Sequence, residues 1–178
     1  MLAAALGRLV KDVPDYPEPG IVFKDITPLL ADHDAFTATV QALADAGRDD
    51  AGGSVVDKVV GMEARGFILA APVALALGAG FVPVRKAGKL PRATHAISYA
   101  LEYGEATLEL HTDAIAPGER VLLVDDVLAT GGTAAATRAL VEACGGTVAG
   151  LAVLMELGFL PGRTAVAPLP VTSLLTVS

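Results

Sequence analysis

VLLVDDVLATGGT, residues 121–133, is the segment of the chain that indicates the fold most strongly. Four apolar residues run into a pair of acids, Asp125 and Asp126, and the glycines Gly131 and Gly132 follow between two threonines. A continuous apolar run of this kind is typical of a strand that is buried on both faces of a parallel sheet. The acids fall at its carboxyl end, which is where open parallel sheets bind their ligands.

Predicted strands and helices alternate on both sides of this stretch. Apolar runs predict strands at 58–62, 81–85, 147–155 and 171–177, the last at an edge, and residues 107–111 alternate like a strand. Apolar spacing predicts helices at 2–10, 34–50, 67–77 and 132–144. This order predicts an α/β fold with a twisted, mainly parallel sheet flanked by helices. We expect residues 1–178 to form a single domain, because no repeat or low-complexity tract divides the chain.

Composition narrows the class of protein. Hydrophobic residues make up 53 % of the chain, which excludes disorder. A single cysteine, Cys144, rules out an intrachain disulfide and fits the reducing cytoplasm, and its interpretation is a small buried apolar side chain rather than a nucleophile. The net charge of −7 argues against a nucleic-acid or anionic-membrane surface, because both need a basic footprint. A small anionic ligand remains compatible, since it needs only local donors.

One apolar stretch reaches the lower length limit of a membrane span. Residues 67–84 carry no charged or polar side chain. They are interrupted by two prolines and two glycines: Pro72, Gly78, Gly80 and Pro83. We therefore interpret the stretch as a buried helix, a turn and a buried strand. Residues 1–12 are too short and too weakly apolar for a secretory signal.

The glycine turn predicts a phosphate site. Residues 130–133 come directly before a predicted helix, so backbone N–H groups and the helix N-terminus can hold an anion, and the threonine hydroxyls add donors. The carboxylates of Asp125 and Asp126 accept hydrogen bonds from vicinal hydroxyls, so the pattern favours a sugar phosphate. A helix cap followed by a turn would give the same letters. The turn is not a kinase-type loop, because no lysine follows its second glycine.

The same stretch resembles the phosphoribosyl-pyrophosphate (PRPP) signature of the type I phosphoribosyltransferases. Further segments follow in the order found in the members of that family that act on adenine, from about Tyr16 to Leu175: DYPEPGIVFKDITPLL (15–30), GMEARGF (61–67), VRKAGKLP (84–91), SYALEYG (98–104) and ELGFLPGR (156–163). The resemblance implies a twisted parallel sheet with flanking helices. It also implies a small N-terminal hood, at about residues 1–33, and a flexible active-site loop, at about residues 86–105.

The resemblance implies one set of residues that binds PRPP and the product AMP: Asp125, Asp126, Ala129, Thr130, Gly131, Gly132, Thr133, Arg65, Arg85, Lys86 and Lys89. The basic run 85–92 is ordinarily a solvated loop, but a pyrophosphate leaving group needs such a local positive field. Arg65 by itself would be a surface residue. By resemblance, the turn 63–66 is a pyrophosphate-binding loop, and a cis peptide is expected near Glu63-Ala64.

A second implied set recognises the base. Glu102 matches the glutamate that faces the imidazole ring of the purine, although the sequence alone makes it an exposed residue. Phe23 is expected to stack on adenine, main-chain groups of Val22 and Lys24 to read its amino edge, and Leu157 to close the opposite face. Simple core packing is the alternative for Phe23 and Leu157.

Taken together, the resemblance implies a purine-salvage enzyme that converts adenine and PRPP to AMP and pyrophosphate. Mg²⁺ is expected to bind mainly through PRPP and pyrophosphate, with no direct protein ligand, and the family implies a homodimer. Two alternatives stay open. One is a phosphoribosyltransferase for another base, and the other is a non-catalytic regulator that senses PRPP.

Overall fold

The computed structural model describes residues 2–101 and 104–178. Within these residues, seven strands form the central sheet in the order β5-β6-β4-β3-β7-β8-β9. Neighbours from β4 to β9 pair in parallel, whereas β6 is antiparallel to both β4 and β5. The strands are β3 (Lys58–Met62), β4 (Gly80–Lys86), β5 (Thr94–Ala100), β6 (Glu105–His111), β7 (Arg120–Leu128), β8 (Thr147–Leu157) and β9 (Val171–Val177). The predicted mainly parallel sheet is confirmed, with β9 at its edge.

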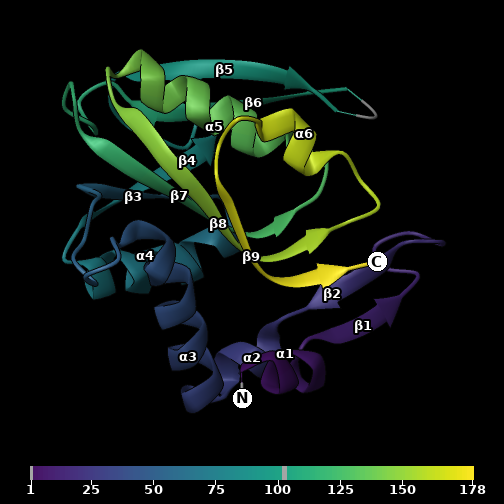
Figure 1. Cartoon of the computed structure of the whole chain (residues 1–178). Helices are drawn as coiled ribbons and strands as arrows, with labels where there is room; N and C mark the ends of the chain where they lie inside the picture. Colours follow the sequence, from purple (N-terminus) through teal and green to yellow (C-terminus); the bar gives the residue numbers. More distant parts are fainter. Residues whose placement is uncertain (1, 102–103) are drawn as a thin grey trace.

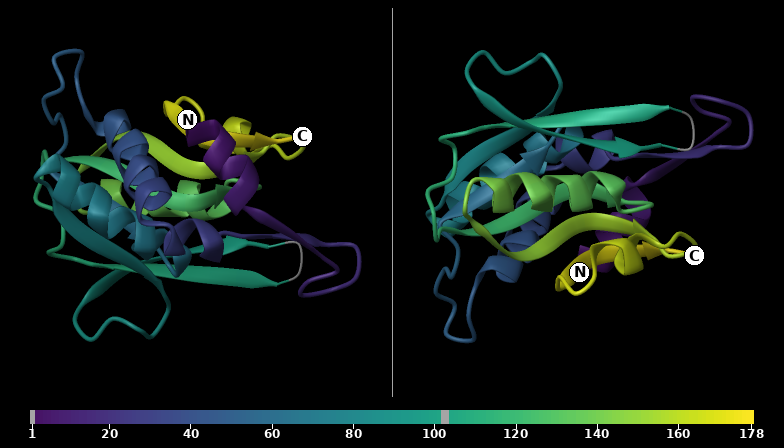
Figure 2. Two further views of the ribbon diagram at one scale, coloured as in Figure 1. Left: turned by 90° about the horizontal axis from the view of Figure 1, so that it is seen from below. Right: turned by 90° about the horizontal axis from the view of Figure 1, so that it is seen from above.

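Helices cover both faces of the sheet (Figure 1). Seen from below, α3 (His33–Ala44) and α4 (Arg65–Leu77) lie in front of the sheet, and seen from above α5 (Gly132–Ala143) does (Figure 2). The shorter helical elements are α1 (Leu2–Leu9), α2 (Thr27–Ala31), α6 (Gly162–Val166) and the 3-10 turn η1 (Asp45–Gly47). Among the described residues, no helix has the length and apolarity needed to span a bilayer.

The apolar run of β7 fills a core on each side of the sheet. Leu122 and Val124 pack with the helices α1 to α4, whereas Val121 and Leu123 pack with α5. All four side chains are fully buried. Because successive side chains of a strand point to opposite faces, an unbroken apolar run is what a strand covered on both faces requires.

The N-terminal part contains a second, small sheet. Strands β1 (Lys11–Pro14) and β2 (Val22–Asp25) pair antiparallel and, with α1 and α2, form the lower part of the molecule in Figure 1. The sequence analysis predicts no strand or helix between residues 10 and 34, so it missed β1, β2 and α2. The prolines concealed the strands, but a two-stranded sheet has only edges, where proline is tolerated.

Three boundaries also differ from the predictions. β7 does not stop at the acids but continues to Leu128, because β8 keeps pairing with it up to Leu128↔Glu156. Within the expected loop 86–105, residues 94–100 form β5, which pairs with β6 along its whole length. α3 ends at Ala44 and not near residue 50, since η1 tightens the chain there.

Candidate active site

The acid pair of β7 lies just past the last residue pair that joins β7 to its neighbour β3. β3 pairs with β7 only as far as Gly61↔Val124. The side of Asp125 that β3 leaves open faces the first turn of α4, where a Cβ on Gly66 would lie 2.7 Å from Oδ1 of Asp125. Glycine at position 66 is therefore what allows α4 to begin directly against the acid pair.

The two acids are electrostatically unequal. Asp126 is 7 % exposed, and its Oδ2 lies 2.6 Å from Nη2 of Arg65 in an ion pair that lacks hydrogen-bond alignment. Oδ1 of Asp125 accepts a hydrogen bond from the backbone N–H of Asp126 at 2.8 Å. Burial, followed by the negative charge of Asp126, raises the pKa of Asp125 well above its ordinary 3.8. A ligand that brings hydroxyl donors would relieve both carboxyl groups.

The turn that follows is open to an anion. Gly131 has a φ of 88° and precedes α5, and no side chain caps the first N–H groups of this helix. The turn residues 129–133 and Asp125 line one cavity of about 70 Å³. The structure thus brings the predicted phosphate turn and one predicted ribose acid into the same cavity, where backbone N–H groups favour negative charge.

Arg65 joins the acid pair to the N-terminal sheet. Its guanidinium lies 4.7 Å from the centroid of the Phe23 ring, and its Nη1 donates to the carbonyl of Lys24 at 3.1 Å. The ammonium of Lys24 points elsewhere, to Asp12 at 2.6 Å. The structure therefore brings together residues predicted for the base and the pyrophosphate, with Arg65 as the link.

The basic segment converges on an acid that the sequence analysis missed. The carboxylate of Glu63, whose side chain is 7 % exposed, contacts Lys89, accepts from the backbone N–H of Lys86 at 2.8 Å and lies 3.5 Å from Nε of Arg85. Burial acts to raise the pKa of Glu63, but the hydrogen bonds and the charges around it prevail and leave it below its ordinary value. The predicted cis peptide Glu63-Ala64 is confirmed. The available signal for Glu63 was its position at the end of the predicted strand 58–62, since the next predicted strand, 81–85, ends at the basic run.

Two further contacts were also missed. Tyr99 on β5 places its hydroxyl 2.9 Å from Oγ1 of Thr133, and its ring lies against Gly132. The alternating apolar residues of β5 are the signal that this strand has an inward face.

Glu156 and Arg163 form an ion pair beside Leu157, and all three residues line a cavity of about 410 Å³. Glu102 lies outside the described residues.

Comparisons with known proteins identify the family. Residues 29–163 match a family model described as a phosphoribosyl transferase domain. Over 169 residues, the chain is 73 % identical to an adenine phosphoribosyltransferase of a Nocardioides species. The aligned region covers 95 % of this chain and 91 % of that protein. The chain belongs to the adenine phosphoribosyltransferase family.

Solved adenine phosphoribosyltransferases share the whole fold. The crystal structure from Rhodothermus marinus matches with a TM-score of 0.92 at 51 % identity, over 99 % of this chain and 98 % of that one. The Saccharomyces cerevisiae structure, a complex with adenine and an imino-altritol bisphosphate, has a TM-score of 0.92 at 39 % identity and covers 98 % of both chains. β1 and β9, which lie outside the matched domain model, thus belong to the adenine phosphoribosyltransferase fold.

Proposed function

We propose that this protein transfers the phosphoribosyl group of PRPP to adenine and releases AMP and pyrophosphate, a purine-salvage reaction. The observation that carries the proposal is the shared cavity of Asp125 and the glycine turn, in a chain of this family. An acid acceptor for ribose hydroxyls and backbone donors for a phosphate stand side by side there.

The turn and the acids fix the sugar. Residues 129–133 hold the 5′-phosphate, and Asp125 and Asp126 accept hydrogen bonds from the ribose hydroxyls. Holding both ends of the ribose phosphate leaves its anomeric carbon in one orientation, which removes part of the entropic cost of attack. The buried oxygen of Asp126 that lacks an aligned donor supports this role.

The basic residues take the leaving group. Nitrogen N9 of adenine attacks the anomeric carbon with inversion, and the bond from this carbon to the pyrophosphate oxygen breaks through an oxocarbenium-like transition state. Arg65, Arg85, Lys86 and Lys89 stabilise the departing negative charge. Arg85 and Lys89 are supported by their convergence, together with the backbone N–H of Lys86, on the carboxylate of Glu63. Pyrophosphate has to draw these donors away from Glu63, since an ionised carboxylate repels a second anion.

The base is held by the N-terminal sheet and by the end of β8. Phe23 stacks on adenine, main-chain groups of Val22 and Lys24 read its amino edge, and Leu157 closes the other face. The guanidinium of Arg65 covers one face of the Phe23 ring at 4.7 Å, so adenine stacks either on the other face or on this face after Arg65 has moved away. Glu102 handles the proton that adenine loses, a form of general acid–base help worth about 10²–10⁴-fold.

We expect Mg²⁺ to be carried into this site by the substrate, as the family resemblance implies. In residues 2–101 and 104–178, no three or more metal-ligating side chains of His, Cys, Asp or Glu gather. Mg²⁺ commonly keeps water ligands and binds through substrate phosphates. Bound in this way, it offsets the charge of the pyrophosphate.

We also propose a homodimer in the cytoplasm. One face of α4 and the adjoining β4 expose large apolar side chains, with Ile68 at 43 %, Leu75 at 83 % and Phe81 at 37 %. Apolar clusters of this kind on a soluble protein mark interaction surfaces. Sedimentation velocity of the wild type and of Leu75→Glu tests it, with a dimer expected for the wild type and a shift towards monomer for the variant.

A panel of bases tests the reaction. Adenine, hypoxanthine, guanine and orotate are each incubated with PRPP and Mg²⁺, and nucleotide formation is followed. AMP formation with adenine is expected to dominate. Activity confined to another base would replace adenine as the substrate, and PRPP binding without turnover of any base would favour a PRPP-sensing regulator.

A further inference from the structure

A fully engaged ion pair lies between the base side and the phosphate side of the proposed site. Glu156 is 9 % exposed at the end of β8, and both of its oxygens accept from Arg163, at 2.6 Å from Nε and 3.1 Å from Nη2. Thr176 of β9 donates to the same carboxylate at 3.0 Å. The hydrogen bonds from Arg163 lower the pKa of Glu156, so the carboxylate stays ionised. The two-point fork fixes orientation as well as distance.

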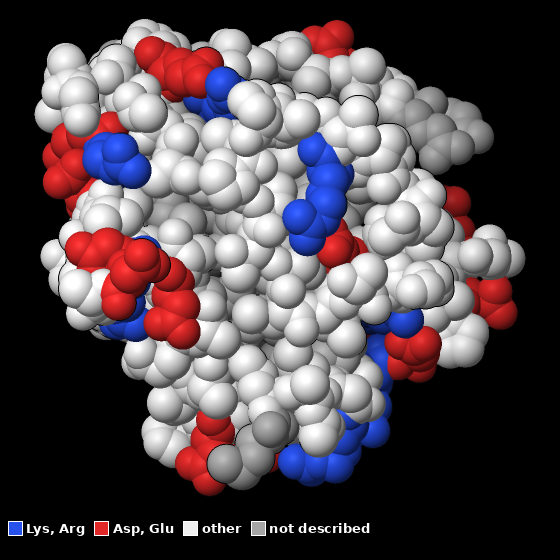
Figure 3. Space-filling view, in the orientation of Figure 1, with Lys and Arg blue, Asp and Glu red and all other residues white. Residues whose placement is uncertain are grey.

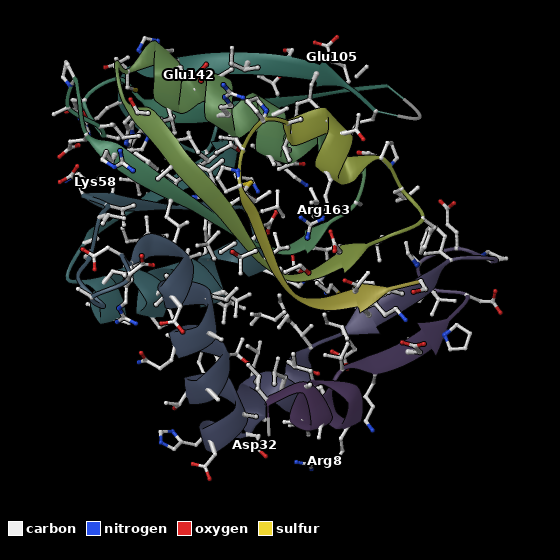
Figure 4. All side chains as sticks on the ribbon, viewed as in Figure 1. Arg8, Asp32, Lys58, Glu105, Glu142 and Arg163 are labelled. Atoms are coloured by element: carbon white, nitrogen blue, oxygen red, sulfur yellow. The ribbon has the colours of Figure 1, made fainter. Side chains whose placement is uncertain are left out.

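Arg163 belongs to a helix that needs outside support. α6 has five residues and no side-chain cap at its N-terminus. Helices this short are unstable in isolation. Val166 anchors one end in the core, and Arg163 ties the other end to Glu156 and to the carbonyl of Val171 at 3.2 Å. In Figure 4 the side chain of Arg163 points from α6 towards β8 and β9, and Figure 3 shows a basic surface at that place in a mostly uncharged area.

α6 in turn packs directly on the phosphate turn. A Cβ on Gly162 would lie 2.4 Å from the carbonyl oxygen of Ala129, and a Cβ on Gly131 would lie 2.9 Å from the carbonyl oxygen of Gly162. The two backbones therefore touch without room for side chains. A shift of α6 must move the turn, because closely packed backbones cannot slide past each other freely.

We propose that Arg163 is a positioning residue for PRPP, which by gripping Glu156 holds α6 against the turn 129–133 and so sets where the amides of the turn point. The inference rests on the proposed function, since it assumes that this turn binds the 5′-phosphate. Arg163 acts through α6 and does not need to touch the substrate.

The test separates positioning from stability. Arg163→Met leaves the buried carboxylate of Glu156 without a cation, which destabilises the fold. The double variant, Arg163→Met with Glu156→Gln, removes both charges and recovers stability. The two variants share the loss of the grip on α6. In both, the KM for PRPP and the dissociation constant of ribose 5-phosphate are expected to rise about 10–100-fold, the scale of losing one hydrogen bond to a charged phosphate. The value of kcat changes less.

Two comparisons sharpen the result. Arg163→Lys restores charge without the fork and is expected to recover part of the affinity. Arg138→Met removes another arginine–glutamate pair, Arg138–Glu142 at 2.8 Å, on the outer part of α5, where Figure 4 labels Glu142. Because this pair does not hold α6, Arg138→Met is expected to bind ribose 5-phosphate like the wild type.

The readouts are thermal unfolding, titration calorimetry with ribose 5-phosphate, and steady-state kinetics with adenine. A double variant that regains wild-type affinity along with stability would overturn the inference, and so would an Arg163→Met protein with unchanged affinity. If Arg163→Met does not fold, the double variant carries the same test. A wild type that binds ribose 5-phosphate but makes no AMP refutes the proposed function and leaves the positioning test intact.

Discussion

Asp125→Asn is expected to make the folded protein more stable while weakening PRPP binding. Asparagine has the shape of aspartate and still offers an oxygen to the N–H of Asp126, which donates to Asp125 at 2.8 Å. The change removes a carboxyl group whose pKa is raised, first by burial and then by the charge of Asp126. The ionised acid therefore lowers the stability of the folded protein. Binding sites commonly keep such destabilising groups because the ligand needs them.

The magnitude follows from the size of such effects. Relief of a strained functional residue commonly gains about 0.5–2 kcal/mol. For a chain of this length, each 1 kcal/mol raises Tm by about 2–4 °C. An acceptor that is charged contributes about 1.5–3 kcal/mol to a hydrogen bond. Losing that contribution to a ribose hydroxyl weakens PRPP binding about 10–100-fold.

The pH dependence has a defined sign. The pKa of Asp125 in the folded protein is raised above the ordinary 3.8. Below pH 3.8 the carboxyl is protonated in both states and costs nothing. As the pH rises from 3.8 towards the folded pKa, the unfolded chain releases its proton first, so the wild type loses stability relative to the variant. Above the folded pKa the difference is constant.

Thermal unfolding from about pH 4 to pH 8 measures the difference in Tm between Asp125→Asn and the wild type. The gain is expected to be smallest at the acid end and to grow with rising pH. Asp126→Asn is the comparison, because it removes the carboxylate that pairs with Arg65 at 2.6 Å. This variant is expected to be less stable than Asp125→Asn, or less stable than the wild type. If the Asp125→Asn variant unfolds at a lower temperature than the wild type at neutral pH, or if its gain in Tm is the same at every pH, then the ionised carboxyl of Asp125 does not destabilise the folded protein.

Three further predictions concern the sites around this acid. Gly66→Ala places a methyl group 2.7 Å from Oδ1 of Asp125, so overpacking is expected to lower the stability of the protein by about 1–3 kcal/mol and to reduce AMP formation. In α1, a methyl group on Gly7 would meet nothing within 4 Å, so Gly7→Ala is expected to raise stability by up to about 1 kcal/mol and to keep full activity. Unfolding and rate assays of both variants check this. Glu102→Gln is expected to lower kcat about 10²–10⁴-fold with little change in the KM for PRPP, and single-turnover kinetics with an unchanged rate would remove Glu102 from the mechanism. Phe23→Ala is expected to raise the KM for adenine about 2–10-fold, by loss of stacking, without affecting calorimetric binding of ribose 5-phosphate; equal effects on both ligands would argue that Phe23 is a packing residue.

The sequence predicted the parts of the fold that carry a periodic or local signal. The apolar run before Asp125 indicated a strand covered on both faces, and the glycines after it indicated a turn and a helix start. The prediction missed the two strands within residues 11–25, because prolines weaken the sequence signal of a strand even where a two-stranded sheet tolerates them. The continuation of β7 to Leu128 was missed because it depends on pairing with β8, which the sequence of β7 does not contain.

The polar contacts of the site were the least predictable part. Glu63 meets Lys89 across 26 positions, and Tyr99 meets Thr133 across 34 positions. Such pairs have no fixed spacing, because the fold and not the local chain brings them together. The resemblance to a known family supplied the predicted site residues that lie in the family's motifs, but it gave no sign of the role that we propose for Arg163.

A crystal structure of the protein with bound AMP would show whether the acid pair and the glycine turn together hold a ribose phosphate. We expect the phosphate of the nucleotide among the backbone amides of residues 129–133, with the ribose hydroxyls within hydrogen-bonding distance of Asp125 and Asp126. A nucleotide bound elsewhere, or one whose phosphate does not touch this turn, would show that these residues do not form the nucleotide site.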